Sequence, residues 1–459
     1  MPPGDNAKIQ CKDTTLKGVI LERCSPPVSL HISSAPSYFK CLFIFQVPWL
    51  LQIVLNAADN PIIFAIMMFF PQCTGWSMSE IRSFNLDVPE TEIDELKARL
   101  NHARWPDSET VDDWTQGVPI NYHREFCEYW ASDYNWYDTQ DRLNKYPQYK
   151  TTIDNLDIHF IHVKSSHKDA TPIIMTHGWP GSIVEFHKVI EPLAEPTKYG
   201  GSPEDAFHVV CPSLPGYGFS GKPTTTGWGV PKIAEAWDEL MARLGYQNYY
   251  AQGGDWGSAV TTAIGLQNKG QCTGIHINMA NAGATKVARG NPDEADKIAL
   301  AGAKFYQDWD SGYSKQQSTR PQTLGYGLAD SPVGQSAWIL EKFFQWTDCN
   351  GHPENVLTRD EIIDNIMFYW LTNTSASSAR LYWESFNQAF GGGKGDTVKL
   401  PTGVSSYPKE IVRTPRSWAE KRYTNIQYWN DLDKGGHFAA FEQPDLFVQE
   451  LRAWKRALS

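Results

Sequence analysis

The feature that most constrains this chain is a sharp turn between a strand and a helix, with an aspartate at its centre. Tyr249-Tyr250-Ala251 has strand character, Gly253-Gly254-Asp255-Trp256-Gly257 follows it, and a helix-compatible run begins at Ser258. Such a tight turn crowds its central residue, so small residues must stand two positions to either side, as Gly253 and Gly257 do. An ordinary Gly-rich turn is the alternative, but the place directly after a strand favours a nucleophile elbow that presents Asp255.

Strand-like and helical runs alternate through the rest of the chain. The runs with strand character are 153–163, 173–175 and 208–211, each followed by a loop rich in Gly or Pro. Helices are predicted at 89–100, at 232–244 before Gly245, and at the C-terminus, where Phe447, Leu451, Trp454 and Leu458 form an apolar stripe. Residues 122–149 show no clean period and are predicted to form an irregular, helix-containing meander. The alternation indicates an α/β fold with a parallel sheet.

Composition narrows the class of protein. The 459 residues suffice for about three units of ~150 residues, or for one large core with an inserted part. A hydrophobic share of 41% excludes general disorder. The 41 Lys and Arg against 52 Asp and Glu give a net charge of −11, which argues against nucleic acid as a partner. The aromatic share of 13% suits a pocket for an apolar ligand.

An aspartate in the nucleophile position implies a particular chemistry. A carboxylate attacks an electrophilic sp3 carbon and forms an alkyl ester, which water later cleaves, so esterase and lipase activities are disfavoured. His177-Gly178-Trp179-Pro180-Gly181 directly follows the strand at 173–175, where the second donor of an oxyanion hole is expected. We therefore expect the backbone N–H groups of Trp179 and Trp256 to face the charge that develops on the ester. A plain Gly-Pro turn with a buried His is the alternative.

A histidine near the C-terminus is the candidate base. His437 lies on the Gly-rich loop 435–440 and follows Asp255 by 182 residues, which leaves room for an inserted cap. It would take a proton from water. Spacing alone leaves four candidates for the acid that orients it: Glu384, Glu410, Glu420 and Asp431. His159 and His162 lie on a strand-like run without Glu or Cys companions and are interpreted as structural.

The first 77 residues differ from the remainder. Two apolar runs, 41–57 and 61–70, fall short of an unbroken span of about 20 residues, so we expect either a bent or interfacial membrane anchor or a leader absent from the working protein. Lys and Arg occur before these runs and not again until Arg82, a bias that would keep the N-terminus in the cytoplasm. The expected location is the cytoplasm or the cytoplasmic face of the endoplasmic reticulum. None of the eight cysteines forms a C-x-x-C pair, so reduced thiols and no metal are expected.

Four motifs carry a resemblance to a known family: HGWPGS at 177–182, GYGFS at 216–220, GGDWGS at 253–258 and GGHFAAFE at 435–442. From about Ile81 onward the chain resembles the epoxide hydrolases of the α/β-hydrolase fold, in the microsomal-type branch. The resemblance implies a mostly parallel sheet flanked by helices, with a helical cap inserted in it. It divides the chain into a leader (1–77), an N-terminal meander domain (78–165), a first part of the core (166–286), the cap (287–398) and a second part of the core (399–459).

The same resemblance implies further site residues. Ser311-Gly312-Tyr313 and Ser378-Ala379-Arg380-Leu381-Tyr382 match the segments that carry two cap tyrosines, which would hydrogen-bond the epoxide oxygen and donate a proton as the ring opens. Tyr369 is a weaker candidate that would line the cap. Among the four acids, the resemblance selects Glu410, which would fix the imidazole tautomer.

The predicted function is hydrolysis of a small apolar epoxide by water to a vicinal diol, with no cofactor, through an ester of Asp255. Such an enzyme would serve detoxification or the catabolism of aromatic hydrocarbons. A haloalkane dehalogenase is one alternative, although a departing halide needs N–H donors and no proton from a tyrosine. A catalytically silent hydrolase fold that binds an apolar ligand or a partner protein is another.

Overall fold

The computed structural model describes residues 80–390 and 395–458, which lie in one compact unit, Met78–Ser459. The apolar runs 41–57 and 61–70, and with them the predicted anchor, lie outside the described residues. Over the ranges that are described, the structure contains no helix of the length and apolar character needed to cross a membrane.

A single sheet organises the described part of the chain. Its nine strands are β1 (Arg82–Phe84), β2 (Gln148–Ile153), β3 (Leu156–Val163), β4 (Thr171–Thr176), β5 (Phe207–Pro212), β6 (Tyr249–Gly253), β7 (Cys272–Ile277), β8 (Thr402–Ser406) and β9 (Ile426–Asp431). Their order across the sheet is β1-β2-β3-β5-β4-β6-β7-β8-β9. From β5 to β9 all neighbours are parallel, as the alternation of strands and helices predicts.

The other edge of the sheet is antiparallel, which the sequence pattern does not predict. β1 pairs with β2, β2 with β3, and β3 with β5, all antiparallel. The run 153–163, predicted as one strand, begins at the end of β2 and continues in β3, because the chain reverses at Asp154 and Asn155. Both residues have positive φ, 47° and 62°, a conformation that Asp and Asn tolerate better than most residues and that two-residue hairpin turns require.

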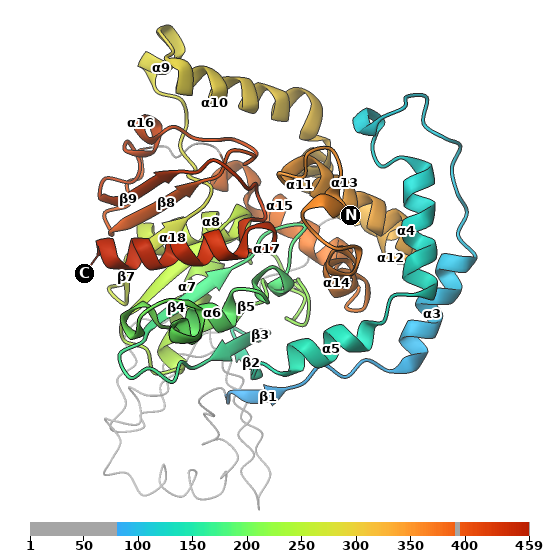
Figure 1. Cartoon of the computed structure of the whole chain (residues 1–459), viewed down its shortest axis with the longest axis horizontal. Helices are drawn as coiled ribbons and strands as arrows, with labels where there is room; N and C mark the ends of the chain where they lie inside the picture. The colour runs from blue at the N-terminus through green and yellow to red at the C-terminus, as the bar shows by residue number, and fades with distance from the viewer. Residues whose placement is uncertain (1–79, 391–394, 459) are drawn as a thin grey trace, which may run out of the picture. The chain divides into compact units, whose positions relative to one another are not determined.

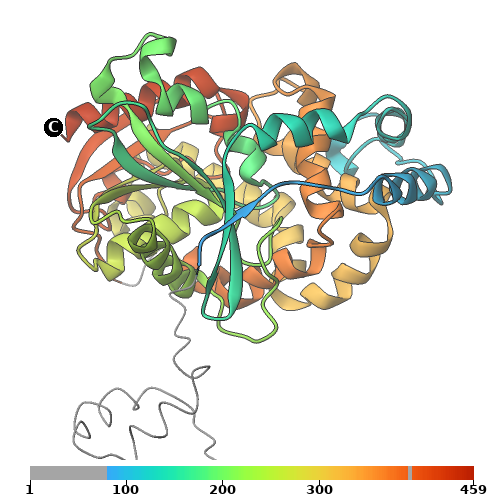
Figure 2. The same ribbon diagram turned by 90° about the horizontal axis from the view of Figure 1, so that it is seen from below.

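Helices cover both faces of the sheet. α6 (Ile190–Ala194) and α18 (Pro444–Ala457) lie on one face, and α7 (Val230–Arg243) and α8 (Asp255–Gln267) on the other (Figure 2). The helix predicted at 232–244 is confirmed as α7, and the positive φ of Gly245, 88°, ends it. The apolar stripe of the C-terminal helix is buried against the sheet in α18.

The N-terminal part of the unit is more regular than predicted. The helix at 89–100 is confirmed as α3 (Glu90–Asn101). Most of 122–149, predicted as an irregular meander, belongs to α4 (Ile120–Ser132), α5 (Trp136–Asn144) and β2. The prediction of irregular structure was wrong because partly buried Tyr122, Tyr129 and Tyr137 add aromatic residues beside the buried Trp130 and Trp136, which hides the helical period in the sequence.

Between β7 and β8 the chain forms a helical layer, α9 to α15 (Figure 1). Its principal elements are α9 (Lys286–Gly290), α10 (Glu294–Phe305), the π-helical turn η6 (Tyr306–Asp310), α11 (Gly312–Thr319), α12 (Pro321–Asp330), α13 (Pro332–Trp346), α14 (Arg359–Trp370) and α15 (Ser375–Ala389). α3 and α4 lie along the outer side of this layer (Figure 1). Arg99 of α3 pairs with Asp330 at 3.0 Å, and His123 of α4 contacts Ser336 of α13 at 2.9 Å.

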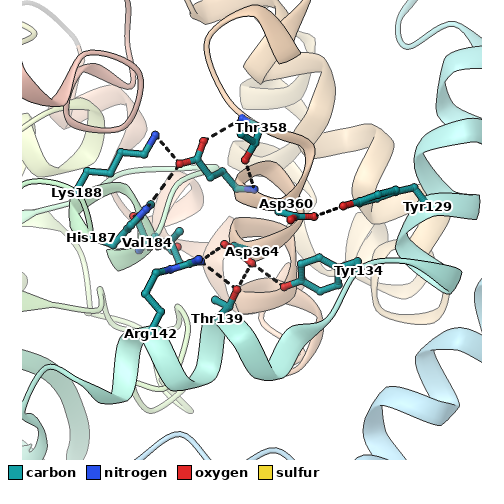
Figure 3. Close-up of polar contacts among 12 residues, drawn as sticks. Tyr129, Tyr134, Thr139, Arg142, Val184, His187, Lys188, Thr358, Asp360 and Asp364 are labelled. Atoms are coloured by element: carbon teal, nitrogen blue, oxygen red, sulfur yellow. Dashed lines mark hydrogen bonds and ion pairs between the residues drawn. The ribbon is translucent and has the colours of Figure 1, made fainter.

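A buried carboxylate joins α5 to α14. Asp364 is fully buried and accepts hydrogen bonds from Tyr134 at 2.7 Å and Thr139 at 2.5 Å, and it forms an ion pair with Arg142 (Figure 3). One turn earlier, exposed Asp360 accepts a hydrogen bond from Tyr129 of α4 at 2.6 Å. The N-terminal helices therefore hold the helical layer through polar contacts to α14.

Candidate active site

Asp255 lies at the junction of β6 and α8, in the turn that the sequence predicts. Its φ of 47° is unusual for a residue with a side chain. A Cβ on Gly253 would lie 2.1 Å from the backbone of Gly257, and a Cβ on Gly257 would lie 1.8 Å from the carbonyl oxygen of Thr176. Both positions must therefore be glycine, and the predicted elbow geometry is confirmed.

The HGWPG loop lies directly over the Asp255 carboxylate. The backbone N–H of Trp179 donates to Oδ1 of Asp255 at 2.8 Å, and a Cβ on Gly178 would come within 2.3 Å of the Asp255 side chain. Trp256, the second predicted donor, lies in the first turn of α8, where backbone N–H groups have no partner within the helix. Both N–H groups and the positive end of the helix dipole suit a site for negative charge.

His177 supports this loop through both of its ring nitrogens. Its Nδ1 contacts the carbonyl oxygen of Gly178 at 2.9 Å, and the backbone N–H of Leu214 donates to its Nε2 at 3.1 Å. Burial lowers the pKa of His177 to about 4, so the ring is neutral at pH 7. His159 and His162 are likewise structural, bonded to Ser213 and Gln148 and to Tyr246 respectively.

His437 lies between two carboxylates. Its Nε2 is 3.4 Å from Oδ2 of Asp255, and its Nδ1 is 2.5 Å from Oε1 of Glu410. Glu410 reaches this position because Lys409 pairs with Gly436 in a short parallel bridge beside β8. The other three candidate acids are engaged elsewhere: Glu384 accepts from the N–H of Gly227, Glu420 pairs with Arg416, and Asp431 accepts from Trp429. Of the four, only Glu410 contacts His437.

The two carboxylates control the charge of the imidazole. Burial lowers the pKa of His437, but the charge of Glu410 and the hydrogen bonds to Asp255 and Glu410 outweigh it. The pKa of His437 consequently lies well above its ordinary value, and the ring is an imidazolium while Asp255 carries its charge.

Tyr313 of α11 and Tyr382 of α15 meet above Trp179. The ring of Tyr313 stacks on that of Trp179 at 4.9 Å, and the rings of Tyr313 and Tyr382 are 5.8 Å apart. The hydroxyls of Tyr313 and Tyr306 share a hydrogen bond of 3.2 Å, whereas the buried hydroxyl of Tyr382 has no hydrogen-bond acceptor among the described residues. Burial raises the pKa of both phenols well above the ordinary value, so both hydroxyls retain their protons.

Tyr369, the weaker candidate, anchors the helical layer to the HGWPG loop. Its hydroxyl donates to the carbonyl oxygen of Gly181 at 2.7 Å, and Asn365, one turn earlier on α14, donates to that of Pro180 at 2.7 Å. On the opposite side, the hydroxyl of Tyr217 in the GYGFS motif donates to the carbonyl oxygen of Ser378 at the start of α15. These contacts fix the positions of Trp179 and Tyr382 relative to one another.

A small cavity extends behind Asp255. It has about 20 Å³ of space, room for about one water molecule. Its polar lining includes Asp255, His437, Glu185, Gln252 and Asn278, and neither cap tyrosine borders it. Sequence analysis did not find the last three residues. Only Glu185 carries a local signal, its place four residues after Gly181 of the HGWPG motif. Within the described ranges, no cluster of His, Cys, Asp and Glu has the arrangement of a metal site.

Comparison with known proteins identifies the family. The sequence pattern described as epoxide hydrolase N terminus matches residues 81–186, and that of the alpha/beta hydrolase fold matches 171–329. A Stigmatella aurantiaca protein that carries the epoxide hydrolase name is 52% identical over 82% of this chain and 85% of its own length. Epoxide hydrolase 1 of Sus scrofa is 38% identical over 81% of this chain and 88% of its own length. The chain belongs to the epoxide hydrolase family.

Solved structures agree with this assignment. Aspergillus niger epoxide hydrolase is similar with a TM-score of 0.74 and 31% identity, over 83% of this chain and 97% of that one. Juvenile hormone epoxide hydrolase of Bombyx mori is similar with a TM-score of 0.73 and 31% identity, over 84% and 97%. The predicted family, the α/β-hydrolase fold and the enzyme class, hydrolases that act on ether bonds, are confirmed.

Proposed function

We propose that this epoxide hydrolase adds water to a small apolar epoxide through a covalent ester of Asp255 and releases a vicinal diol. The observation that carries the proposal is the position of the Asp255 carboxylate, bonded to the Trp179 N–H at 2.8 Å and 3.4 Å from His437, in a site whose loop packs against two buried tyrosines. Nucleophile, base and proton donors thus surround one reaction space.

In the first step, Oδ2 of Asp255 attacks one carbon of the oxirane while Tyr313 and Tyr382 bind the ring oxygen. The C–O bond of the ring breaks, and the oxygen takes a proton from a phenol as negative charge develops on it. The free hydroxyl of Tyr382 supports this role, because a buried donor without a partner is available to the substrate. His437 keeps its proton in this step, so Asp255 remains a carboxylate and can act as the nucleophile.

In the second step, the charge on His437 changes. Esterification removes the negative charge of Asp255, one of the two groups that hold the pKa of His437 high, so that pKa falls. The imidazolium then gives up its proton, which replaces the one that the phenol lost in the first step, and the neutral imidazole can act as a base. It takes a proton from water, whose oxygen attacks Cγ of the ester, and the resulting oxyanion accepts hydrogen bonds from Trp179 and Trp256. The Cγ–O bond to the substrate breaks, and the imidazolium returns its proton to the leaving alkoxide. The carboxylic acid of Asp255 that remains then gives its proton to the imidazole, which restores the starting carboxylate and imidazolium.

Haloalkane dehalogenation shares the aspartate ester but not the leaving group. A halide leaves as an anion and has no use for two phenols that retain their protons, so the buried tyrosine pair favours an epoxide.

The test is incubation with styrene oxide and, separately, with a chloroalkane. We expect diol from the epoxide, no chloride from the chloroalkane, and no diol from Asp255→Ala. Chloride release would favour the dehalogenase, and inertness toward both substrates in folded protein would favour a silent ligand-binding fold. Loss of a catalytic nucleophile typically lowers the rate by several orders of magnitude. Diol formation by Asp255→Ala at more than about a few per cent of the wild-type rate would therefore contradict the mechanism.

A further inference from the structure

Glu185 is a buried carboxyl in the active-site cavity to which the two-step mechanism gives no role. It belongs to the 3-10 turn η3 (Ile183–Phe186), is 9% exposed, and forms no ion pair with a described residue. The cavity that it lines also borders Asp255 and His437. A buried carboxyl is costly unless its oxygens are hydrogen-bonded, and beside the backbone N–H of Ser182 the cavity offers room for one further partner.

The Glu185 carboxyl occupies space that a side chain at position 181 would otherwise fill. An ideal Cβ on Gly181 would lie 1.4 Å from Oε1 of Glu185, so the carboxyl occupies the space that any larger residue at 181 would need. Gly181 has no positive φ that would itself call for glycine. The last glycine of the HGWPG motif is therefore explained by the carboxyl group of Glu185.

The cavity has the polar lining that a water molecule needs. Oε1 of Gln252 is buried there without a hydrogen-bond partner among the described residues, while the amide of Gln252 donates to Asn278 at 3.4 Å. A buried water makes two to four hydrogen bonds to such groups, and about one water fits in the available 20 Å³. Burial raises the pKa of Glu185 to about 8, so at pH 7 its neutral carboxyl leaves His437 as the only base beside this water.

We propose that Glu185 positions the hydrolytic water, accepting one of its hydrogens while the other points at Nε2 of His437, so that the oxygen faces Cγ of the Asp255 ester. Glu185 exchanges no proton: the water's proton goes to His437, and the new C–O bond forms at Cγ. Glu185 is thus a positioning residue for the second step alone. The inference rests on the proposed function.

The test separates the two steps in a single turnover with styrene oxide. Mass spectrometry of the intact protein in quenched samples gives the rate at which the adduct forms and the rate at which it is lost. For Glu185→Leu, which keeps the bulk but has no acceptor, we expect alkylation within about twofold of wild type and hydrolysis slowed on the order of 100-fold, the cost of a misplaced reactant. Glu185→Gln keeps a carbonyl acceptor, as the neutral carboxyl does, and should hydrolyse the adduct at close to the wild-type rate.

Gly181 provides a second, independent arm. In Gly181→Ala the new Cβ displaces the Glu185 carboxyl, so hydrolysis should slow as it does in Glu185→Ala. In the double variant Gly181→Ala/Glu185→Ala, the methyl group at 181 enters space that the truncation at 185 has already freed. The second substitution should therefore slow hydrolysis by less than a further twofold, because the effects of residues in contact are not additive. Asp205→Asn, which neutralises a buried carboxyl that pairs with Arg456 and does not line the cavity, is the control and should leave both rates unchanged in folded protein.

The outcomes distinguish this inference from the proposed function. If wild type forms no adduct on Asp255, the ester mechanism itself fails. If the adduct forms and Glu185→Leu hydrolyses it within twofold of the wild-type rate, or slows alkylation as much as hydrolysis, the positioning role is overturned and the ester mechanism stands.

Discussion

The charge of His437 depends on its two carboxylate neighbours, which makes its titration predictable. The imidazolium is stabilised only in the folded protein, so its contribution to the free energy of unfolding is full below pH about 6.5 and is lost as pH rises through the raised folded pKa. We expect Asp255→Asn, which has the neutral charge of the ester, to lower the pKa of His437. Glu410→Gln should lower it more, because the charge of Glu410 contributes most. The His437 ring proton in NMR titrations reports both shifts.

An unchanged His437 pKa in both variants would mean that the imidazole base is not generated by loss of charge on Asp255. Glu442→Gln is the control for this titration. The Glu442 carboxyl accepts a hydrogen bond from the N–H of Asp348 and supports the loop that carries His437, but it does not contact the imidazole.

Substitution of His437, the proposed base, should stop the reaction at the Asp255 ester. In His437→Gln, Asp255 keeps its nucleophilic oxygen and its contact with Trp179, so attack on the epoxide should proceed while hydrolysis slows by roughly 100-fold or more. A protein heavier by one substrate mass should accumulate, with the added mass on the peptide that contains Asp255. Substrate binding without any adduct would refute the two-step scheme.

The two proposed proton donors, Tyr313 and Tyr382, belong to different helices, α11 and α15. Tyr313→Phe and Tyr382→Phe should each slow alkylation by roughly 10-fold, and the double variant should be almost inactive, because the ring oxygen then has neither a hydrogen-bond donor nor an acid. Adduct formation in a single turnover measures this directly. Tyr306→Phe, which removes only the neighbour of Tyr313, is the matched control. Wild-type rates in both single variants would mean that the pair has been misassigned.

At the scale of elements, α14 depends on the buried carboxylate that α5 surrounds. Asp364→Ala leaves Arg142, Tyr134 and Thr139 without their acceptor, and we expect a loss of about 3 kcal/mol in the free energy of unfolding. The matched control is Asp360→Ala on the same helix, whose bond to Tyr129 is exposed and should be worth less than about 1 kcal/mol. Urea unfolding measures both, and equal losses would mean that burial of the network contributes nothing.

Elements were predictable from sequence where one local constraint governed them. The elbow at Asp255 follows from sterics within five residues, and α7 from a simple apolar period that ends at Gly245. Spacing could not choose Glu410 among four acids, because the choice depends on a bridge between Lys409 and Gly436, 27 residues apart along the chain. Glu185 was missed for a similar reason, since only the folded structure shows that its carboxyl fills the space beside Gly181.

At the scale of the whole molecule, every residue that we assign to chemistry lies within the compact unit Met78–Ser459. The roles of these residues, and the domain boundaries at 165/166, 286/287 and 398/399, stay predictions. We expect a protein shortened to start at Met78 to fold and to hydrolyse styrene oxide at the full-length rate. Activity and thermal unfolding of the two forms, measured side by side, check this. A large loss in the short form would mean that residues 1–77 contribute to the working enzyme beyond any role in location.

The close packing of three glycines around Asp255 limits where this enzyme can be altered by directed evolution. Gly178, Gly253 and Gly257 have no room for even one methyl group, since each would place it within 2.3 Å of the nucleophile or of its supporting backbone. Codon libraries at these three positions would consist almost entirely of inactive clones. Substitutions that change substrate preference are better sought beside Tyr313 on α11 and Tyr382 on α15, the helices that bring these tyrosines to the Trp179 ring.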